Sequence, residues 1–215
     1  YKAVVTDAAG NTSETAVQKV VVDTTTPHSG ELTLSDLNDT GVSVTDQITQ
    51  DKNFNLKLEG QETGSRVTYL VSTDEGKTWQ ETTVAQKDLA DGVYKYKAVV
   101  TDAAGNTSET AVQKVVVDTT TPHSGELTLS DLNDTGVSVT DQITQDKNFN
   151  LKLEGQETGS RVTYLVSTDE GKTWQETTVA QKDLADGVYK YKAVVTDAAG
   201  NTSETAVQKV VVDTT

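Results

Sequence analysis

Cysteine and methionine are both absent from the sequence, and only two prolines occur. Without cysteine, the inter-sheet disulfide found in many secreted β-sandwich domains is excluded, so a fold of that class needs another source of stability. Metal binding is one such source. Long apolar runs are missing as well, because none approaches the roughly 20 residues that a membrane-spanning helix requires. Membrane insertion by this segment is therefore not expected.

Residue combinations that carry catalysis are also missing. The only histidines, His28 and His123, each follow a proline and have no companion histidine in the same half of the chain. This argues against a histidine-rich zinc site. The sequence contains neither a Gly-x-Ser-x-Gly nucleophile motif nor a glycine-rich phosphate-binding loop. We therefore expect no enzymatic activity.

Positive charge is scarce: 18 lysines and arginines face 33 aspartates and glutamates, for a net charge of −15. A chain this acidic is a poor partner for nucleic acid or for an anionic membrane. The same charge suits divalent cations. The alternative is that the acidic residues serve only to keep the protein soluble.

The most informative positive feature is an exact internal repeat. Residues 1–25 recur unchanged at 96–120 and 191–215, and residues 26–95 recur unchanged at 121–190. Solenoid repeats are usually about 20–50 residues long and cannot bury a core alone. A unit of 95 residues is long enough to be a small domain. The sequence therefore predicts a tandem array of domains.

The unit boundaries follow from two Thr-Thr-Thr-Pro segments, Thr24–Pro27 and Thr119–Pro122. Proline fixes φ and favours an extended residue before it, as a linker requires. We therefore place one unit at 24–118 and its identical copy at 119–215, which includes the start of a further linker. Residues 1–23 are then the last two strands of a preceding, truncated unit.

Alternation of apolar and polar residues predicts an all-β fold, an antiparallel sandwich of about seven strands per unit. No helical period competes. The residues expected to be buried in the first unit are Phe54, Leu56, Leu58, Val67, Tyr69, Tyr96 and Ala98. The expected strands are Glu31–Ser35, Phe54–Leu58, Val67–Val71, Thr82–Val84, Tyr94–Val100 and Ala111–Val117, the last with ambiguous facing.

A tyrosine corner is suggested by Asp91-Gly92-Val93-Tyr94. In immunoglobulin-like sandwiches this tyrosine bonds back to the main chain near the start of the penultimate strand. Tyr94 and its copy Tyr189 are therefore expected to have structural roles.

A second motif invites an enzymatic interpretation. Residues Ser72 to Trp79 match the Asp-box pattern Ser-x-Asp-x-Gly-x-Thr-Trp, which sialidases carry, and the pattern recurs at 167–174. A sialidase needs several arginines to clamp a carboxylate, whereas each unit has only one. We therefore expect a turn in which an aspartate accepts bonds from main-chain amides and a tryptophan packs on the hairpin. The residues concerned are Asp74 and Trp79, with their copies Asp169 and Trp174.

Taken together, the unit resembles bacterial Ig-like repeats. Asn38–Ser43 and Asp46–Thr49 resemble the opening of such repeats, and Asp91-Gly92, Thr101–Thr107 and Val116–Pro122 resemble their close. Repeats of this kind occur in Bap-like and giant non-fimbrial adhesins, many of them exported by type I secretion. The resemblance implies an extracellular location on a bacterial cell surface, and calcium held at the junctions between domains.

Ig-like strand order then indicates which loops meet at a junction. The loop between the last two strands lies at the domain's N-terminal pole, and the loop between the first two strands lies at the opposite pole. Calcium prefers six to eight oxygen ligands, and clustered carboxylates repel one another without a cation. Asp and Asn are also common turn formers, so these residues could serve the loops alone. The candidate ligands are Asp118, Asp197 and Asn201, with Asp39 or Asp46, and at the preceding junction Asp23, Asp102 and Asn106.

Two functions are compatible with this reading. The first is a calcium-stiffened spacer in a large surface adhesin that supports adhesion or biofilm formation. Its partners are the neighbouring repeats, while a host or cell-surface target is bound elsewhere in the full protein. The alternative is a glycan- or protein-binding module that gains avidity from repetition. An exposed aromatic platform would favour that alternative, but only Trp79 and scattered tyrosines are available.

Overall fold

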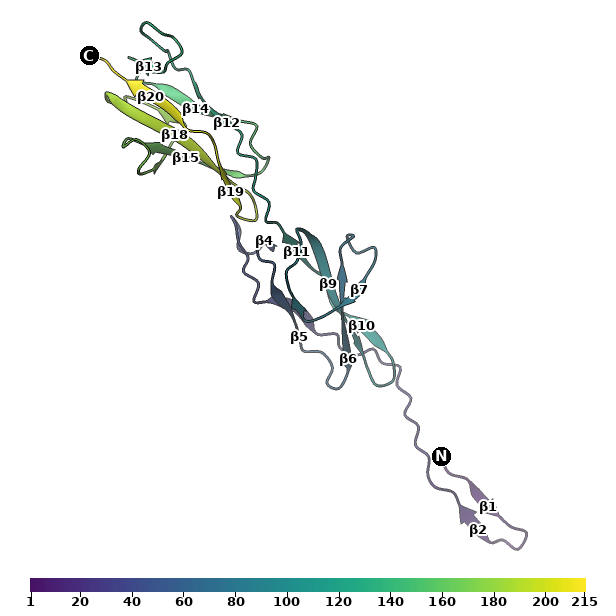
Figure 1. Ribbon diagram of the computed structural model, residues 1–215. Helices are drawn as coiled ribbons and strands as arrows, with labels where there is room; N and C mark the ends of the chain where they lie inside the picture. The colour runs from purple at the N-terminus through teal and green to yellow at the C-terminus, as the bar shows by residue number, and fades with distance from the viewer.

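The computed structural model describes all 215 residues and consists of strands, turns and loops without any helix. Two sandwich units and an N-terminal hairpin lie in a row, so the molecule is elongated (Figure 1). No helix is long and apolar enough to cross a membrane. The expected all-β tandem fold is confirmed, although each unit has nine strands rather than about seven.

Each unit contains a small sheet and a larger sheet. In the first unit the small sheet has the order β3-β5-β8, and the larger has the order β4-β11-β9-β6-β7 with β10 paired to β9. The bounds are β3 Glu31–Ser35, β4 Ile48–Thr49, β5 Phe54–Glu59, β6 Arg66–Ser72, β7 Gln80–Thr82, β8 Ala85–Gln86, β9 Gly92–Thr101, β10 Thr107–Glu109 and β11 Gln113–Val117.

The second unit repeats this topology, with a small sheet β12-β14-β17 and a larger sheet β13-β20-β18-β15-β16 to which β19 adds through β18. Its bounds are β12 Glu126–Ser130, β13 Ile143–Thr144, β14 Phe149–Glu154, β15 Arg161–Ser167, β16 Gln175–Thr177, β17 Ala180–Gln181, β18 Gly187–Thr196, β19 Thr202–Glu204 and β20 Gln208–Val212.

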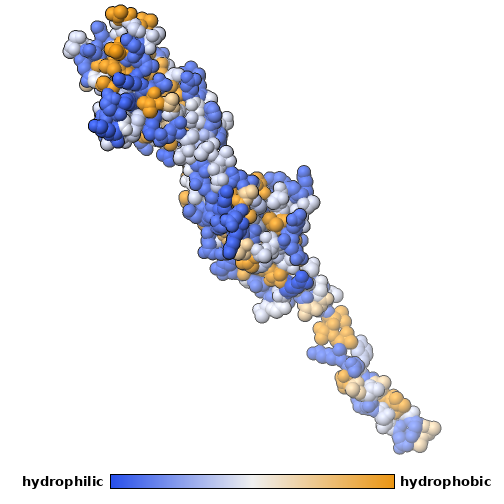
Figure 2. Space-filling view, viewed as in Figure 1, coloured by the Kyte–Doolittle hydropathy of each residue, from blue (hydrophilic) through white to orange (hydrophobic).

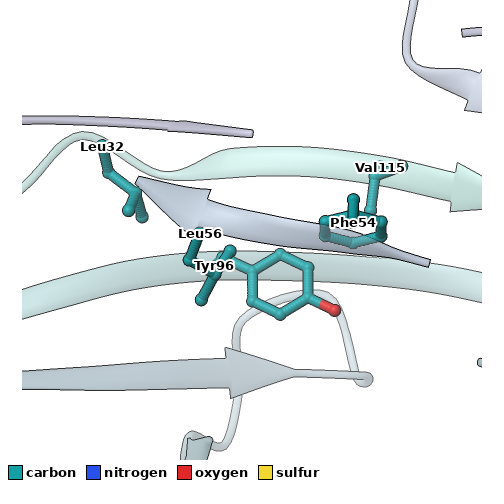
Figure 3. Packing of buried hydrophobic residues seen from close by; sticks show 5 residues of the cluster. All are labelled: Leu32, Phe54, Leu56, Tyr96 and Val115. Carbon is teal, nitrogen blue, oxygen red and sulfur yellow. The ribbon is translucent and has the colours of Figure 1, made fainter. Parts of the chain in front are cut away.

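The core lies between the two sheets of each unit. Phe54 packs edge-on against Tyr96, with the ring centroids 5.7 Å apart, a favourable aromatic arrangement. Figure 3 shows these two rings between the sheets. The buried cluster comprises Leu32, Phe54, Leu56, Tyr96 and Val115, and its copy Leu127, Phe149, Leu151, Tyr191 and Val210.

The predicted core is only partly correct. Phe54, Leu56, Tyr96 and Ala98 are buried, whereas the other three expected residues are partly exposed. Two of them, Leu58 and Tyr69, pack against the cluster from its margin. The small sheet has three strands, one of only two residues, so it does not cover the whole face of the larger sheet. Val67, the third, lies near the beginning of β6.

Two expected strands depart most from the observed bounds. The single strand expected at Thr82–Val84 is in fact two strands, because the chain leaves β7 after Thr82 and enters β8 at Ala85, in the other sheet. The last strand begins at Gln113 rather than at Ala111, and Val115 and Val117 are its buried residues.

One pairing departs from the antiparallel expectation. Strand β4, which alternation did not reveal, pairs in parallel with β11, placing Ile48 beside Val116. The chain therefore passes from the small sheet to the larger sheet between β3 and β4. The long loop between β3 and β4 lies at one pole of the unit.

Residues 1–23 form a hairpin without a core. Its strands β1 (Val4–Thr6) and β2 (Thr12–Glu14) pair with each other and with no other strand. Val20 is 66% exposed, whereas Val115, the same residue of the complete unit, is 0% exposed. Figure 2 shows apolar residues along this exposed hairpin.

Candidate functional site at the junction between units

The junction brings together three segments from two units. They are the β3–β4 loop of the first unit, the linker that begins at Asp118, and the β18–β19 loop of the second unit. Figure 1 shows β4 and β11 of one unit facing the β18–β19 end of the next. The β18–β19 loop of the second unit thus meets the β3–β4 loop at the opposite pole of the first unit.

The β18–β19 loop, Asp197–Asn201, is closed by its own first and last side chains. The Asp197 carboxylate accepts the Asn201 main-chain N–H at 2.8 Å and the Asn201 side-chain amide at 2.9 Å. In the first unit, the hydrogen bond from the Asn106 side chain, together with bonds from main-chain amides, holds the pKa of Asp102 below its ordinary value. The hydrogen bonds of the β9–β10 loop therefore favour the ionised form of Asp102.

The same asparagine joins the loop to the linker. Asn201 Nδ2 donates to the main-chain oxygen of Asp118 at 3.0 Å. The Asp118 carboxylate instead accepts the Thr120 N–H within the linker, at 3.0 Å. Asp118 thus contacts the second unit through its carbonyl group.

The linker is also tied back to the first unit. The hydroxyls of Thr119 and Thr120 donate to the Asp91 carboxylate at 2.9 and 3.0 Å. Hydrogen bonds from Thr119 and Thr120 lower the pKa of Asp91 from its ordinary value, with the Thr119 hydroxyl the largest cause. The threonines of the Thr-Thr-Thr-Pro segment therefore hold the linker against the β9 end of the unit that precedes it.

The β3–β4 loop supplies the other side of the junction. Thr40 Oγ1 donates to the Ala199 carbonyl at 2.6 Å, which joins the two units directly. Asp39 Oδ2 accepts the Gln47 N–H at 2.9 Å, while Asp39 Oδ1 is buried and has no hydrogen-bond partner. Asp46 accepts the Ile48 N–H at 3.1 Å and so caps β4.

The structure thus places the predicted ligands as follows. Asp197, Asn201 and the carbonyl of Asp118 are joined by hydrogen bonds, and Asp39 is next to the residue that contacts Ala199. Asp46 serves its own strand. No group of three or more His, Cys, Asp or Glu side chains is arranged to hold a metal.

The junction before the first unit is a half version of the same arrangement. Asn106 Nδ2 donates to the Asp23 carbonyl at 3.1 Å and to the Asp102 carboxylate at 2.8 Å. No β3–β4 loop covers it, so Asp102 is partly exposed, whereas Asp197 is 4% exposed. The β3–β4 loop is therefore what buries the aspartate.

Asp197 is buried without a basic partner. None of the salt bridges includes Asp39, Asp118 or Asp197. Burial of an unpaired carboxylate is costly unless hydrogen bonds or a cation compensate it. The junction therefore concentrates negative charge.

Thr40, Gly41, Ala199 and Gly200 also contribute to the junction, although sequence reasoning did not select them. The available signal was a pair of small-residue segments, Thr-Gly and Ala-Ala-Gly, in the two loops expected to meet. Small residues are what a close main-chain approach requires.

The two tyrosines chosen for structural roles each bond to the main chain four residues earlier. Tyr94 Oη donates to the Ala90 carbonyl at 2.9 Å, and Tyr189 Oη donates to the Ala185 carbonyl at the same distance. This is the geometry of a tyrosine corner.

The Asp-box segment forms a turn between β6 and β7. Asp74 accepts the Thr78 N–H at 2.9 Å, the Thr78 hydroxyl at 2.6 Å and the Ser72 hydroxyl at 2.8 Å. These bonds, the Thr78 hydroxyl foremost, lower the pKa of Asp74 to about 2. Gly76 has a positive φ of 91°. Asp169 makes the same bonds in the second unit, and its pKa is also about 2.

The tryptophan after this turn is covered by a lysine. Lys97 Nζ lies 4.6 Å from the centroid of the Trp79 ring, and Lys192 lies at the same distance from Trp174. Lys97 also pairs with Glu109 at 2.8 Å. The ring is therefore engaged on one face by its own unit.

Comparison with known families decides the class of the domain. The family model of bacterial Ig-like domains matches residues 26–119 and again residues 121–214. The chain belongs to the bacterial Ig-like domain family. A second model of bacterial Ig-like domains matches residues 1–24, which form the N-terminal hairpin. No curated protein matches the chain.

Several solved structures are similar to the chain at low identity. One is described as a Ca²⁺-stabilized adhesin that helps an Antarctic bacterium reach out and bind ice: 19% identity, TM-score 0.45, with 99% of this chain and 56% of that chain covered. The chain thus spans about half the length of that structure. The FN1–FN3 domains of chicken CNTN1 match at 11% identity and TM-score 0.38, over 97% of this chain and 76% of theirs. The fibronectin(III)-like modules of Clostridium thermocellum CbhA match at 16% identity and TM-score 0.39, over 85% and 94%.

Proposed function

We propose that this chain is a spacer segment of a large bacterial surface adhesin and that it acts outside the cell. The observation that carries the proposal is the exact repetition of an Ig-like unit whose copies lie in a row. Identical units add length without adding a new chemical surface. With the 10-residue strand β9 at about 3.4 Å per residue plus a short linker, one more unit extends the chain by roughly 40 Å.

The proposed role is structural and not catalytic. The motif closest to an enzyme signature is a turn whose aspartate has its oxygens occupied by Thr78 and Ser72. The binding-module alternative needs an exposed aromatic surface, but the one tryptophan of each unit lies beneath a lysine. Neighbouring repeats are therefore the proposed partners of each unit, and the adhesion target is bound by another part of the full protein.

Calcium at the junction is the finer part of the proposal. The oxygen atoms suit calcium chemically, because Asp197 is a buried carboxylate without a basic neighbour and Asp39 Oδ1, like its copy Asp134 Oδ1, is buried without a hydrogen-bond partner. Asp39, Asp118, Asp197 and Asn201 would hold the ion. Bound calcium would neutralise the carboxylates that crowd the junction. The Asn201 side-chain amide donates to the Asp118 carbonyl and the Gln47 main-chain N–H donates to the Asp39 carboxylate, and these bonds would support the ligands.

The spacer role is tested by changing the number of units. On cells that display the full adhesin, removal of one or more units should shorten the reach in proportion and leave the affinity of the target-binding region unchanged. The purified chain should bind no glycan on an array. Glycan binding by the chain itself, or loss of target affinity when units are removed, would favour the binding-module alternative.

A further inference from the structure

The two units touch through main-chain atoms of glycine residues. A Cβ built on Gly200 would lie 2.9 Å from the Cα of Gly41, and a Cβ built on Gly41 would overlap the Ala198 carbonyl. Real Cβ atoms essentially never come so close to main-chain atoms. Only glycine at both positions allows this approach.

The loop that receives the second unit has the same conformation when no unit is docked on it. Thr40 Oγ1 accepts the Gln50 N–H at 2.9 Å, and its copy Thr135 Oγ1 accepts the Gln145 N–H at 2.8 Å, although no loop contacts Thr135. The φ values of Gly41 and Gly136 are 101° and 98°. The loop therefore requires no reordering on docking, which removes one of the usual costs of association.

The hydroxyl of Thr40 is free to serve the neighbour. Thr49 Oγ1 donates its own hydrogen to the Asn38 carbonyl at 2.6 Å, so the Thr40 hydroxyl hydrogen is left for the Ala199 carbonyl at 2.6 Å. This donor, this acceptor and the glycine main chains are all uncharged. None of the atoms in this contact needs a cation as its partner.

We propose that residues 38–50, here called the socket loop, form a preformed socket for the Asp-Ala-Ala-Gly-Asn loop of the next unit. This contact between the socket loop and the next unit, here called the latch, selects one orientation between consecutive units and needs no metal ion. Ala199 is 0% exposed in the latched loop, whereas Ala104, its copy in the uncovered loop, is exposed. The latch rests on the proposed spacer function, because a spacer needs defined angles at its junctions. Calcium would then tighten an orientation that the latch has already selected.

The absence of cysteine allows a clean test on the full chain. Spin labels are attached to the double variant Lys77→Cys/Lys172→Cys, at equivalent exposed positions of the two units. Pulsed electron spin resonance then gives the distribution of distances between the units, in excess chelator and in millimolar calcium. We expect one dominant distance in chelator and a narrower peak at the same distance in calcium.

The decisive variant is Gly41→Ala, with Gly136→Ala as its matched control. Both substitutions place alanine at the same positive φ in the same loop, but only the first meets a neighbouring unit. A second pair is Gly200→Ala and Gly105→Ala, since the latter has nothing within 4 Å of its Cβ. In chelator, Gly41→Ala and Gly200→Ala should lose most of the population at the dominant distance, and both controls should keep that population.

The outcomes separate the latch from the calcium proposal. Equal distributions for each variant and its control would overturn the latch, as would a dominant distance that occurs only in calcium. The second result would leave a calcium-stiffened spacer intact. A dominant distance that is present in chelator and unaffected by calcium would support the latch and contradict calcium stiffening.

Discussion

Asp74 and Asp169 show how hydrogen bonds within one turn can make the stability of the protein depend on pH. Each holds the β6–β7 type of turn with three bonds from serine and threonine. All three bonds are strongest to the ionised carboxylate. The pattern Ser-x-Asp-x-Gly-x-Thr-Trp thus encodes a turn whose strength depends on pH.

Stability should therefore fall in acid through these two residues. Their folded-state pKa of about 2 lies below the ordinary 3.8, so the ionised side chains stabilise the fold above about pH 4, and this contribution is lost as pH falls toward 2. Melting curves of the chain and of Asp74→Asn/Asp169→Asn should differ at pH 6 and converge near pH 2. A constant difference across that range would contradict the assignment.

The tyrosine corner should contribute a modest amount to stability. Tyr94→Phe/Tyr189→Phe removes one hydroxyl-to-carbonyl bond from each unit, which should cost about 1 kcal/mol per unit in the free energy of unfolding. The matched control is Tyr69→Phe/Tyr164→Phe, because neither of those hydroxyls has a hydrogen-bond partner within the protein. Urea denaturation should show a loss for the first pair only.

At the scale of elements, the strands that alternation revealed are those with a buried face. Strand β3 was predicted with its correct bounds, and β5, β6 and β9 were predicted to within two residues. The three-residue strand β10 was not predicted, and the two-residue strands β4 and β8 escaped prediction as well, because two residues carry no periodicity. Their existence depends on partners that are distant in sequence, such as Val116 for Ile48.

At the candidate site, too, contacts within one loop could be predicted from the sequence, whereas contacts between distant residues could not. Asp197 and Asn201 could be predicted because they close their own loop, four residues apart. The contact between Thr40 and Ala199 spans 159 residues and depends on how two units dock. Ig-like strand order indicated which loops meet, but it could not identify the touching atoms.

The N-terminal hairpin provides a test of how much burial between two sheets contributes to stability. Val20 and Val115 have the same sequence neighbours, but only Val115 lies between two sheets. Val115→Ala should lower the stability of the first unit by about 2 kcal/mol, from lost burial and a residual cavity. Val20→Ala should leave the unfolding of both units unchanged. A comparable loss from both substitutions would show that the hairpin is packed in solution.

At the scale of the whole molecule, the repeated units share every residue, so differences between them arise only where their neighbours differ. Strand burial patterns agree in the two units except at β4 and its copy β13, and the loop aspartate is buried only at the complete junction. A neighbouring unit therefore changes the burial of residues only at the poles of a unit. Each added unit brings one more junction of the same kind.

Calcium should act at the complete junction and hardly at all elsewhere. The proposed ligands of the ion are Asp118, Asp197 and Asn201, with Asp39. A dissociation constant on the order of 10⁻⁴–10⁻³ M is typical of extracellular calcium modules. Because binding to the folded state alone stabilises by mass action, excess chelator should lower the melting temperature. Calorimetric titration of the full chain should show one dominant site, since the junction before the first unit lacks the β3–β4 loop.

Asp118→Ala should reproduce the effect of chelator, whereas Asp213→Ala should not. Asp213 is the copy of Asp118 at the end of the second unit, and no following loop bonds to its carbonyl. Small-angle scattering should show less flexibility in calcium than in chelator, and Asp118→Ala should remove that difference while both units stay folded. If the scattering of the unmodified chain were the same in calcium and in chelator, calcium would have no stiffening role, and the orientation of the units would depend on the loop contact alone.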